Sequence, residues 1–146
     1  MTLFEQIAAA VLLVVLTLCI QCAGVAALIH WLRTVAMKDI RKLPIANATV
    51  LVMQTTLAIV ILQGLVIFMW AGCYRWLCFS SWNTAFYFSG STYSTVGYGD
   101  VVLPAKWHLL GALESMMGVL MCGISVSLLF AVITRLIETE AAASGS

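Results

Sequence analysis

Three long stretches of this chain contain almost no charge, and each is long enough to cross a lipid bilayer as a helix. They run from about Ile7 to Leu32, from Ala48 to Gly72 and from Trp107 to Thr134, with Glu114 as their only charged residue. One helical span of a bilayer takes roughly 20 apolar residues. The stretches therefore predict an all-α membrane protein with three transmembrane helices per chain.

The composition agrees with this prediction. Of the 146 residues, 63% are hydrophobic and 9% are charged. A soluble domain of this size has too little interior to hide so much apolar surface. The net charge of +1 provides no broad basic face, so nucleic acid is not an expected partner. A cleavable signal peptide is not expected either, because the first stretch is too long and follows Glu5 instead of a basic segment.

Basic residues set the expected orientation. Four of the seven lie in or beside the linker 34–47, which joins the first two stretches: Arg33, Lys38, Arg41 and Lys42. Because basic loops stay in the cytoplasm, the amino terminus is expected outside and the carboxyl terminus inside. All five tryptophans fall at predicted membrane boundaries, as an interfacial belt would: Trp31, Trp70, Trp76, Trp82 and Trp107. We expect an integral protein of a plasma membrane or a bacterial inner membrane.

The stretch from Ser80 to Pro104 is aromatic and rich in hydroxyl groups, and it is too short and too polar to span a bilayer. It divides into a helix-like part, from Trp82 to about Ser94, and an extended part punctuated by glycines. Irregular backbone is tolerated at membrane depth only where protein encloses it or where it lines a water-filled cavity. We therefore predict a re-entrant loop that dips into the membrane from the outer side.

Residues 95–100 of this loop read Thr-Val-Gly-Tyr-Gly-Asp. A Gly-Tyr-Gly segment elsewhere is often only a surface turn, but this one lies between a short aromatic helix and two bilayer-length spans. The motif resembles the selectivity filter of the potassium-channel pore family. The resemblance covers about 48–137 and implies a homotetramer, with one loop per chain around a common axis, that conducts K⁺ passively.

The resemblance implies K⁺ ions in the filter and no organic cofactor. Backbone carbonyls of Thr95, Val96, Gly97 and Tyr98 would replace the hydration shell of the ion, and the Thr95 hydroxyl would add an oxygen at the inner end. Such a backbone needs unusual φ values, which Gly97 and Gly99 tolerate at the lowest cost. The side chains of Val96 and Tyr98 are expected to point away from the axis and to pack behind the filter.

Residues around the motif are expected to support it. Tyr87 and Phe88 resemble the aromatic cuff that braces the filter tyrosine in this family. Ser91 stands where some members carry an acid. Asp100, at the outer mouth, would either concentrate cations or hydrogen-bond the pore helix from behind, and we favour the second role.

An ionisable residue inside a spanning helix is a functional hypothesis by default. Glu114 is predicted to bond a hydroxyl such as that of Ser91 or Thr92, or a neighbouring subunit, and so to brace the filter. The alternative is an acid whose protonation gates the pore.

The third span also offers candidates for a hinge or a gate. Gly118 and Gly123 are typical of positions where such a helix bends or packs closely. With Gly118 facing the cavity, Leu129 and Ile133 share its face and would form a hydrophobic constriction. The plainer interpretation of this apolar stripe is helix packing.

The remaining segments suggest no further domain. The chain divides into an amino-terminal span (1–33), a basic linker (34–47), a pore domain (48–137) and a tail (138–146) whose last six residues resemble an engineered extension. The first span has no basic residue within the membrane, which argues against a voltage sensor built on arginines. Regulation would come from membrane lipids, the linker or a separate regulatory protein.

Cys73 and Cys78 lie in a predicted outer loop, where a disulfide is chemically feasible but is not settled by spacing. Cys19 and Cys22 lie in an apolar run and are interpreted as packing residues, not as a metal or redox pair. Three rival functions are a regulatory pore-family subunit, a pore-loop transporter and an enzyme. The intact motif argues against the first, its single copy against the second, and the lack of a paired nucleophile and base against the third.

Overall fold

A computed structural model describes residues 3–36 and 45–144 of the chain. Helix α1 (Leu3–Trp31) continues into a π-helical turn (Leu32–Ala36), and α2 (Ile45–Leu77) follows. The short helix α3 (Trp82–Tyr93) precedes a 3₁₀ turn (Ala105–Trp107) and the long helix α4 (His108–Ser144). Within these described ranges the chain is all-helical. Lys38, Arg41 and Lys42 of the basic linker lie outside the described residues.

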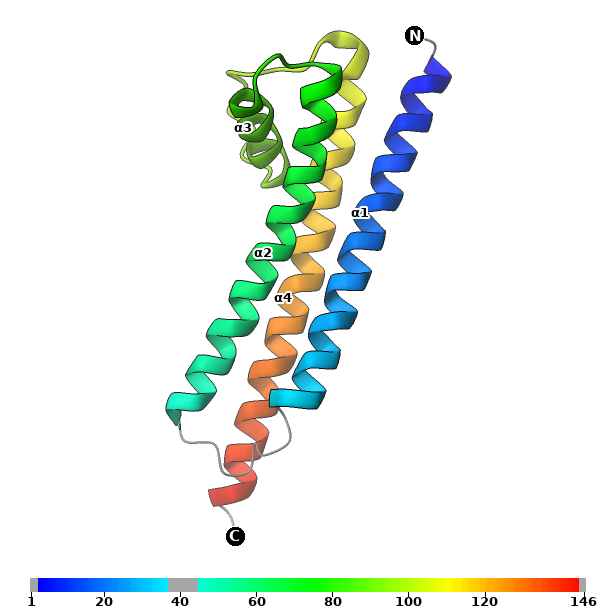
Figure 1. Cartoon of the computed structure of the whole chain (residues 1–146). Helices are drawn as coiled ribbons and strands as arrows, with labels where there is room; N and C mark the ends of the chain where they lie inside the picture. Colours follow the sequence, from blue (N-terminus) through cyan, green and yellow to red (C-terminus); the bar gives the residue numbers. More distant parts are fainter. Residues whose placement is uncertain (1–2, 37–44, 145–146) are drawn as a thin grey trace.

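The three long helices confirm the predicted spans. They are long and apolar enough to cross a membrane over Glu5–Thr34, Asn47–Leu77 and Ala105–Glu138. Figure 1 shows them side by side, with α3 packed against α2 and α4 at the end of the bundle where the amino terminus lies. Helix α4 runs on to Ser144 and so includes most of the tail 138–146.

The larger of two apolar clusters joins α3 to the long helices. It includes Trp70 and Tyr74 of α2, Phe88 of α3, Trp107 of the 3₁₀ turn and Met117 of α4. Trp70 and Trp107 differ from the exposed belt that was predicted, because both indoles are buried in the protein core. Trp76, by contrast, is 85% exposed, as an interfacial residue would be.

Helix α1 is attached to the other helices by buried polar contacts. The Trp70 indole N–H donates to the Thr17 hydroxyl at 2.9 Å, and the Gln21 amide donates to the Ser125 hydroxyl at 3.2 Å. Gly24 gives close approach as well, since an added Cβ would lie 2.4 Å from the Leu62 side chain. Small residues such as Gly24 are typical of closely packed membrane helices, and the polar contacts add a specificity that the apolar pattern did not reveal.

Replacing Thr17 by valine should weaken this attachment. The change keeps the shape but removes the acceptor for the buried Trp70 N–H, so we expect a loss of about 1 kcal/mol in stability. Thr56→Val is the matched control, because that exposed hydroxyl bonds only its own helix, at the Val52 carbonyl. Thermal unfolding in detergent measures both variants, and equal midpoints would contradict a stabilising role for the Thr17–Trp70 contact.

Candidate functional site

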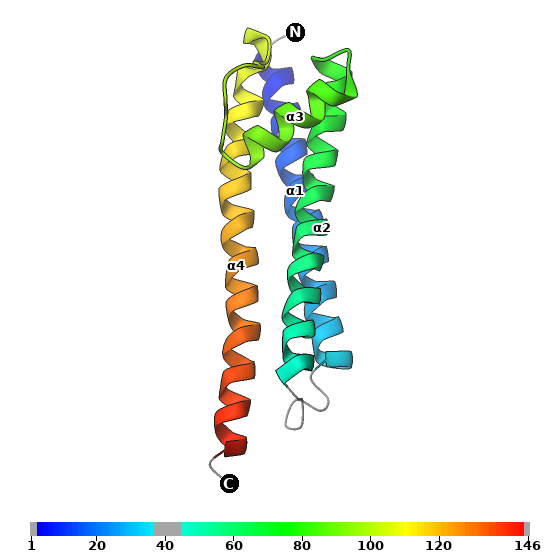
Figure 2. The same ribbon diagram turned by 90° about the vertical axis from the view of Figure 1, so that its left-hand side faces the viewer.

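The segment that follows α3 returns along α4 to the end of the bundle from which α3 started. Figure 2 shows this connection rising from the far end of α3 to the beginning of α4. The end of α3 is capped by its own backbone, with the Thr95 N–H bonded to the Thr92 carbonyl and the Gly97 N–H to the Ser91 carbonyl, each at 3.0 Å. These two bonds anchor the start of the predicted filter.

The backbone of residues 95–99 is left-handed at every second position. Thr95 has φ 62°, Gly97 has φ 51° and Gly99 has φ 77°. The values at the glycines fit the prediction, whereas Thr95 is unexpected, because a β-branched residue rarely adopts positive φ. Such strain costs on the order of 1–3 kcal/mol and is often found at functional sites. Thr95 is thus a strained residue at the start of the motif.

The carbonyl oxygens of residues 95–99 accept no hydrogen bond from the described part of the chain. All five residues are exposed. A row of exposed, unengaged carbonyls can coordinate a cation, which is the chemistry that the motif predicts.

Two contacts support the outer end of the motif. The rings of Tyr87 and Tyr98 are stacked, with centroids 6.5 Å apart and planes 9° apart. The Tyr87 hydroxyl donates to Asp100 Oδ2 at 2.8 Å, while Asp100 Oδ1 accepts from the Val101 N–H at 3.0 Å. The favoured role of Asp100, a bond to the pore helix, agrees with this geometry. Both side chains that were expected to pack behind the motif, Val96 and Tyr98, are exposed within one chain, and of the two only Tyr98 has the ring contact described above.

The bond to Asp100 raises the pKa of Tyr87, with a smaller contribution from burial. The phenol therefore stays protonated, and keeps donating, until the pH exceeds that raised value.

Glu114 is fully buried and joins α4 to both neighbouring helices. Its Oε2 accepts from the Tyr74 hydroxyl of α2 at 2.8 Å, and its Oε1 accepts from the Ser89 hydroxyl of α3 at 2.5 Å. Ser89 also lies 3.0 Å from the Ile67 carbonyl of α2. Glu114 thus braces the helix that precedes the motif.

Glu114 accepts from hydroxyl groups, as predicted, but neither Ser91 nor Thr92 is the donor. Ser91 bonds the Phe88 carbonyl of its own helix, and the Thr92 carbonyl accepts from Ser115 of α4. Two residues along a helix correspond to a rotation of about 200°. When Ser89 faces Glu114, Ser91 therefore points away, and the spacing to the filter did not reveal this rotation.

A second polar network was missed. The Tyr93 hydroxyl donates to Gln63 Oε1 at 2.8 Å, and Gln63 Nε2 donates to the Ser125 hydroxyl at 2.7 Å. Because Gln21 also bonds Ser125, side chains of all four α-helices are connected. Gln21 and Gln63 could have indicated this network in the sequence, since uncharged polar residues in apolar spans often bond across helices.

Gly118 does not face an open cavity. An added Cβ would lie 1.9 Å from the Tyr93 carbonyl oxygen, so this glycine allows α4 to approach the end of α3. The prediction that Gly118 faces the cavity is therefore corrected. Leu129 and Ile133, both half-buried, were placed on a pore face because they share the face of Gly118. That reason no longer holds for them. Gly123 has no neighbouring atom within 4 Å of an added Cβ and remains a candidate hinge.

The structure has free thiols at Cys73 and Cys78, both half-buried, in place of the disulfide that was considered. Burial is the main cause that raises the pKa of Cys78 to about 11. We expect slow maleimide labelling of Cys78 at neutral pH and faster labelling as the pH approaches that value, because the thiolate is the reactive form. Mass spectrometry of the labelled protein without reductant measures the extent of labelling. A mass lower by two hydrogen atoms would indicate a disulfide between Cys73 and Cys78.

Comparison with known proteins identifies the group to which this arrangement belongs. The sequence model of the family described as ion channel matches residues 50–135, well over half of the chain. That range contains nearly all of α2, the whole of α3, the following loop and most of α4, whereas α1 lies outside it. Searches of curated proteins and of solved structures gave no match. With three helices able to cross a membrane, the chain is an integral membrane protein that belongs to the ion channel family.

Proposed function

We propose that this chain is one subunit of a homotetrameric channel that conducts K⁺ selectively and passively. The observation that carries the proposal is the row of exposed carbonyls at residues 95–99, which bond no group of the described chain. In the proposed channel, the Thr95, Val96, Gly97 and Tyr98 carbonyls bind K⁺ in the filter, and the Thr95 hydroxyl contributes at the inner end. No organic cofactor is part of this proposal.

The exposure of the loop supports assembly around an axis. Irregular backbone cannot face lipid, because its polar groups would lose their hydrogen bonds. In a single chain the loop 94–100 is exposed throughout, so other protein or water must surround it. One loop per chain can enclose a pore when four chains pack about a common axis, and each subunit would then cover Val96 of a neighbour.

Charge supports one orientation of the subunit. We propose that the linker 34–47 is cytoplasmic because it is basic. The loop then lies at the outer side, with the amino terminus outside and the carboxyl terminus in the cytoplasm. Membrane lipids and the other subunits are the proposed partners, in a plasma membrane or a bacterial inner membrane.

Ion flux from liposomes that contain the purified full chain tests this function. The wild-type protein should release K⁺ and very little Na⁺. Gly99→Ala should abolish flux or remove the selectivity, because alanine is strained at φ 77°. Gly72→Ala on α2 is the matched control, with no atom within 4 Å of the added Cβ. Equal K⁺ and Na⁺ flux from folded wild-type protein would refute selectivity, and no flux at all would favour a regulatory subunit.

Tyr87→Phe tests the support of the outer mouth. Phenylalanine keeps the ring stacked on Tyr98 but removes the hydroxyl that donates to Asp100. We expect a folded protein whose K⁺ flux declines sooner after it starts and whose Na⁺ leak is larger. Phe86→Leu on the same helix serves as the control, since Phe86 contacts the Phe68 ring of α2 and not Asp100. If Tyr87→Phe has the flux and selectivity of the wild type, the bond between Tyr87 and Asp100 does not contribute to selectivity.

A further inference from the structure

Gln21 is buried near the middle of the first span, and its amide is only partly used. Its side chain is 1% exposed. The Nε2 group donates to the Ser125 hydroxyl of α4 at 3.2 Å, whereas Oε1 has no hydrogen-bond partner in the described part of the chain. A buried carbonyl oxygen without a donor costs stability, and an apolar side chain of similar shape avoids that cost. Gln21 is therefore a poor choice for stability alone, and its bond to Ser125 is what an apolar residue could not replace.

The Ser125 hydroxyl lies at the centre of the network that Gln21 joins. It donates to the Met121 carbonyl at 2.8 Å and accepts from both Gln21 and Gln63. A hydroxyl has one donor and two acceptor positions, so all of them are occupied. Gln63 Nε2 donates to Ser125 and to the Met121 carbonyl, which turns Gln63 Oε1 toward Tyr93. Gln21 thus completes the set of bonds that fixes the Gln63 amide.

The other end of the network is Tyr93, the last residue of α3. Its side chain is buried, and its hydroxyl donates to Gln63 Oε1 at 2.8 Å. Thr95, with φ 62°, follows two positions later. The N–H groups of Thr95 and Gly97 bond carbonyls in the last turn of α3. A contact that fixes the end of α3 therefore also fixes the start of residues 95–99, the proposed filter.

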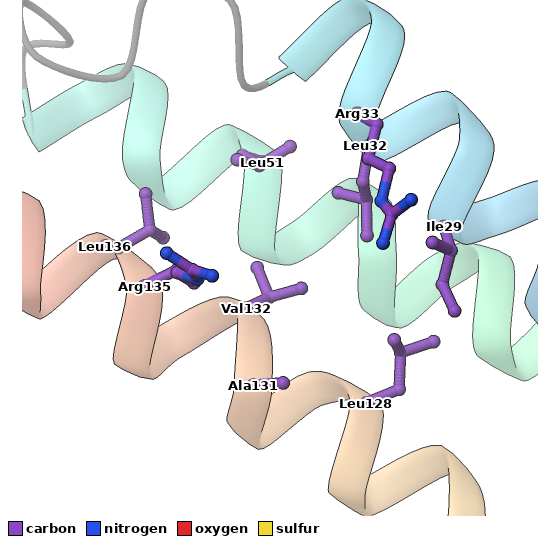
Figure 3. Close-up of a pocket in the computed structure, with 9 residues that line it drawn as sticks. All are labelled: Ile29, Leu32, Arg33, Leu51, Leu128, Ala131, Val132, Arg135 and Leu136. Atoms are coloured by element: carbon purple, nitrogen blue, oxygen red, sulfur yellow. The ribbon is translucent and has the colours of Figure 1, made fainter.

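Apolar packing between α1 and α4 is incomplete toward the opposite end of the bundle. A cavity of about 270 Å³ lies there among α1, α2 and α4. Figure 3 shows aliphatic side chains of all three helices around it, among them Ile29, Leu51 and Leu128. Unfilled space forfeits contacts that would hold one helix against another. Along α4, Ser125 precedes the residues that line this cavity, so its bond to Gln21 fixes α4 relative to α1 where apolar contacts become incomplete.

We propose that Gln21 is a positioning residue for the filter. It holds Ser125, and through it the Gln63 amide, in the arrangement that keeps Tyr93 and the start of the filter in place. The effect on selectivity rests on the proposed function, whereas the coupling of Gln21 to residues 95–97 does not. Gln21 lies outside the range 50–135 that matches the ion channel family. Helix α1 thus supplies a support for the filter that the family segment does not contain.

Gln21→Met tests the proposal, because methionine keeps the length of the side chain and removes the amide. In liposomes that contain the full chain, the preference for K⁺ over Na⁺ should fall about threefold, the effect of one hydrogen bond between membrane helices. The unfolding temperature should equal or exceed that of the wild type, since the unpaired Oε1 is also removed. A loss of stability with wild-type selectivity would show that Gln21 is merely structural and would overturn the proposal.

Thr17→Val is the matched control. Thr17 lies about one turn from Gln21 on the same buried face of α1, but it bonds Trp70 and not Ser125. This variant should lose stability and keep its selectivity, the reverse of what we expect for Gln21→Met. An equal loss of selectivity in both variants would show that any loosening of α1 acts on the filter, and the specific role of Gln21 would be refuted.

Tyr93→Phe removes the bond at the other end of the network. It should lower selectivity to a similar extent. The double variant with Gln21→Met should be about as selective as either single variant, because both changes break the same chain of bonds. Fully additive losses would contradict a single network that joins Gln21 to Tyr93.

Hydrogen exchange of the full chain in detergent micelles gives a readout that does not depend on flux. The Thr95 and Gly97 N–H groups should exchange about threefold faster in Gln21→Met and Tyr93→Phe, and at the wild-type rate in Thr17→Val. Unchanged exchange in Gln21→Met would overturn the coupling. Faster exchange in a protein whose wild type does not select K⁺ would refute only the proposed function. Faster exchange with full selectivity would overturn the role of Gln21 in selectivity.

Discussion

Replacing Gly118 by alanine should displace α3 from α4 and destabilise the protein by about 3 kcal/mol or more. The added Cβ would lie 1.9 Å from the carbonyl oxygen of Tyr93 and 2.9 Å from its carbonyl carbon. Both atoms are backbone, so no side-chain rotation relieves the clash. Tyr93 is the last residue of α3, and the strained Thr95 follows two positions later. A shift here would therefore reach residues 95–100, the proposed filter, as well as the core.

Gly123→Ala is the control for this substitution. It lies on the same helix, and an added Cβ there meets no atom within 4 Å. We expect its unfolding temperature in detergent to stay close to that of the wild type, while Gly118→Ala unfolds much earlier and loses flux. Comparable stability of the two variants would show that α4 does not approach α3 as closely as the structure indicates.

Removing the Glu114 carboxylate should have the second-largest effect. Glu114→Ala leaves the buried Tyr74 hydroxyl without its acceptor and leaves the Ser89 hydroxyl with only the Ile67 carbonyl to donate to. It also opens a cavity among three helices. We expect a loss on the order of 2–4 kcal/mol in stability. Glu138→Gln on the exposed side of α4 is the control for loss of an acid and should be nearly neutral. Thermal unfolding in detergent measures all of these variants.

Glu114→Gln distinguishes bracing from gating by protonation. The amide keeps one oxygen acceptor and the same shape, so a bracing residue should lose only about 1 kcal/mol. Flux should then respond to a change from mildly acidic to mildly alkaline buffer as the wild type does. If gating depends on protonation of Glu114, the substitution will remove that response, since glutamine does not titrate. Unchanged stability together with unchanged flux would contradict both roles.

The features that were predicted correctly depend on short stretches of sequence. Apolar runs of bilayer length located the three long helices, and the glycines at 97 and 99 anticipated their positive φ. The position of Asp100 at the end of the motif also suggested its bond to the preceding short helix, α3, although not the identity of Tyr87 as donor.

The errors share one physical cause, which is the rotation of each helix about its axis. Whether Ser89 or Ser91 faces Glu114 depends on a turn of about 200°, and no local pattern fixed that turn. The same applies to Gly118, which faces α3, and to Trp70, whose buried indole bonds Thr17 of α1. In an almost uniformly apolar helix, hydrophobic periodicity carries little information about the buried face.

The contacts between α1 and the other helices have a consequence for how the channel can be divided or recombined. The segment that matches the ion channel family begins at residue 50, yet its Trp70 indole N–H finds its acceptor on Thr17, and its Ser125 is bonded by Gln21. A chimaera that transplants residues 50–135 alone would leave that indole N–H facing hydrocarbon, where an unsatisfied polar group costs several kcal/mol. The transferable module of this protein therefore starts with its first helix, not at the family boundary.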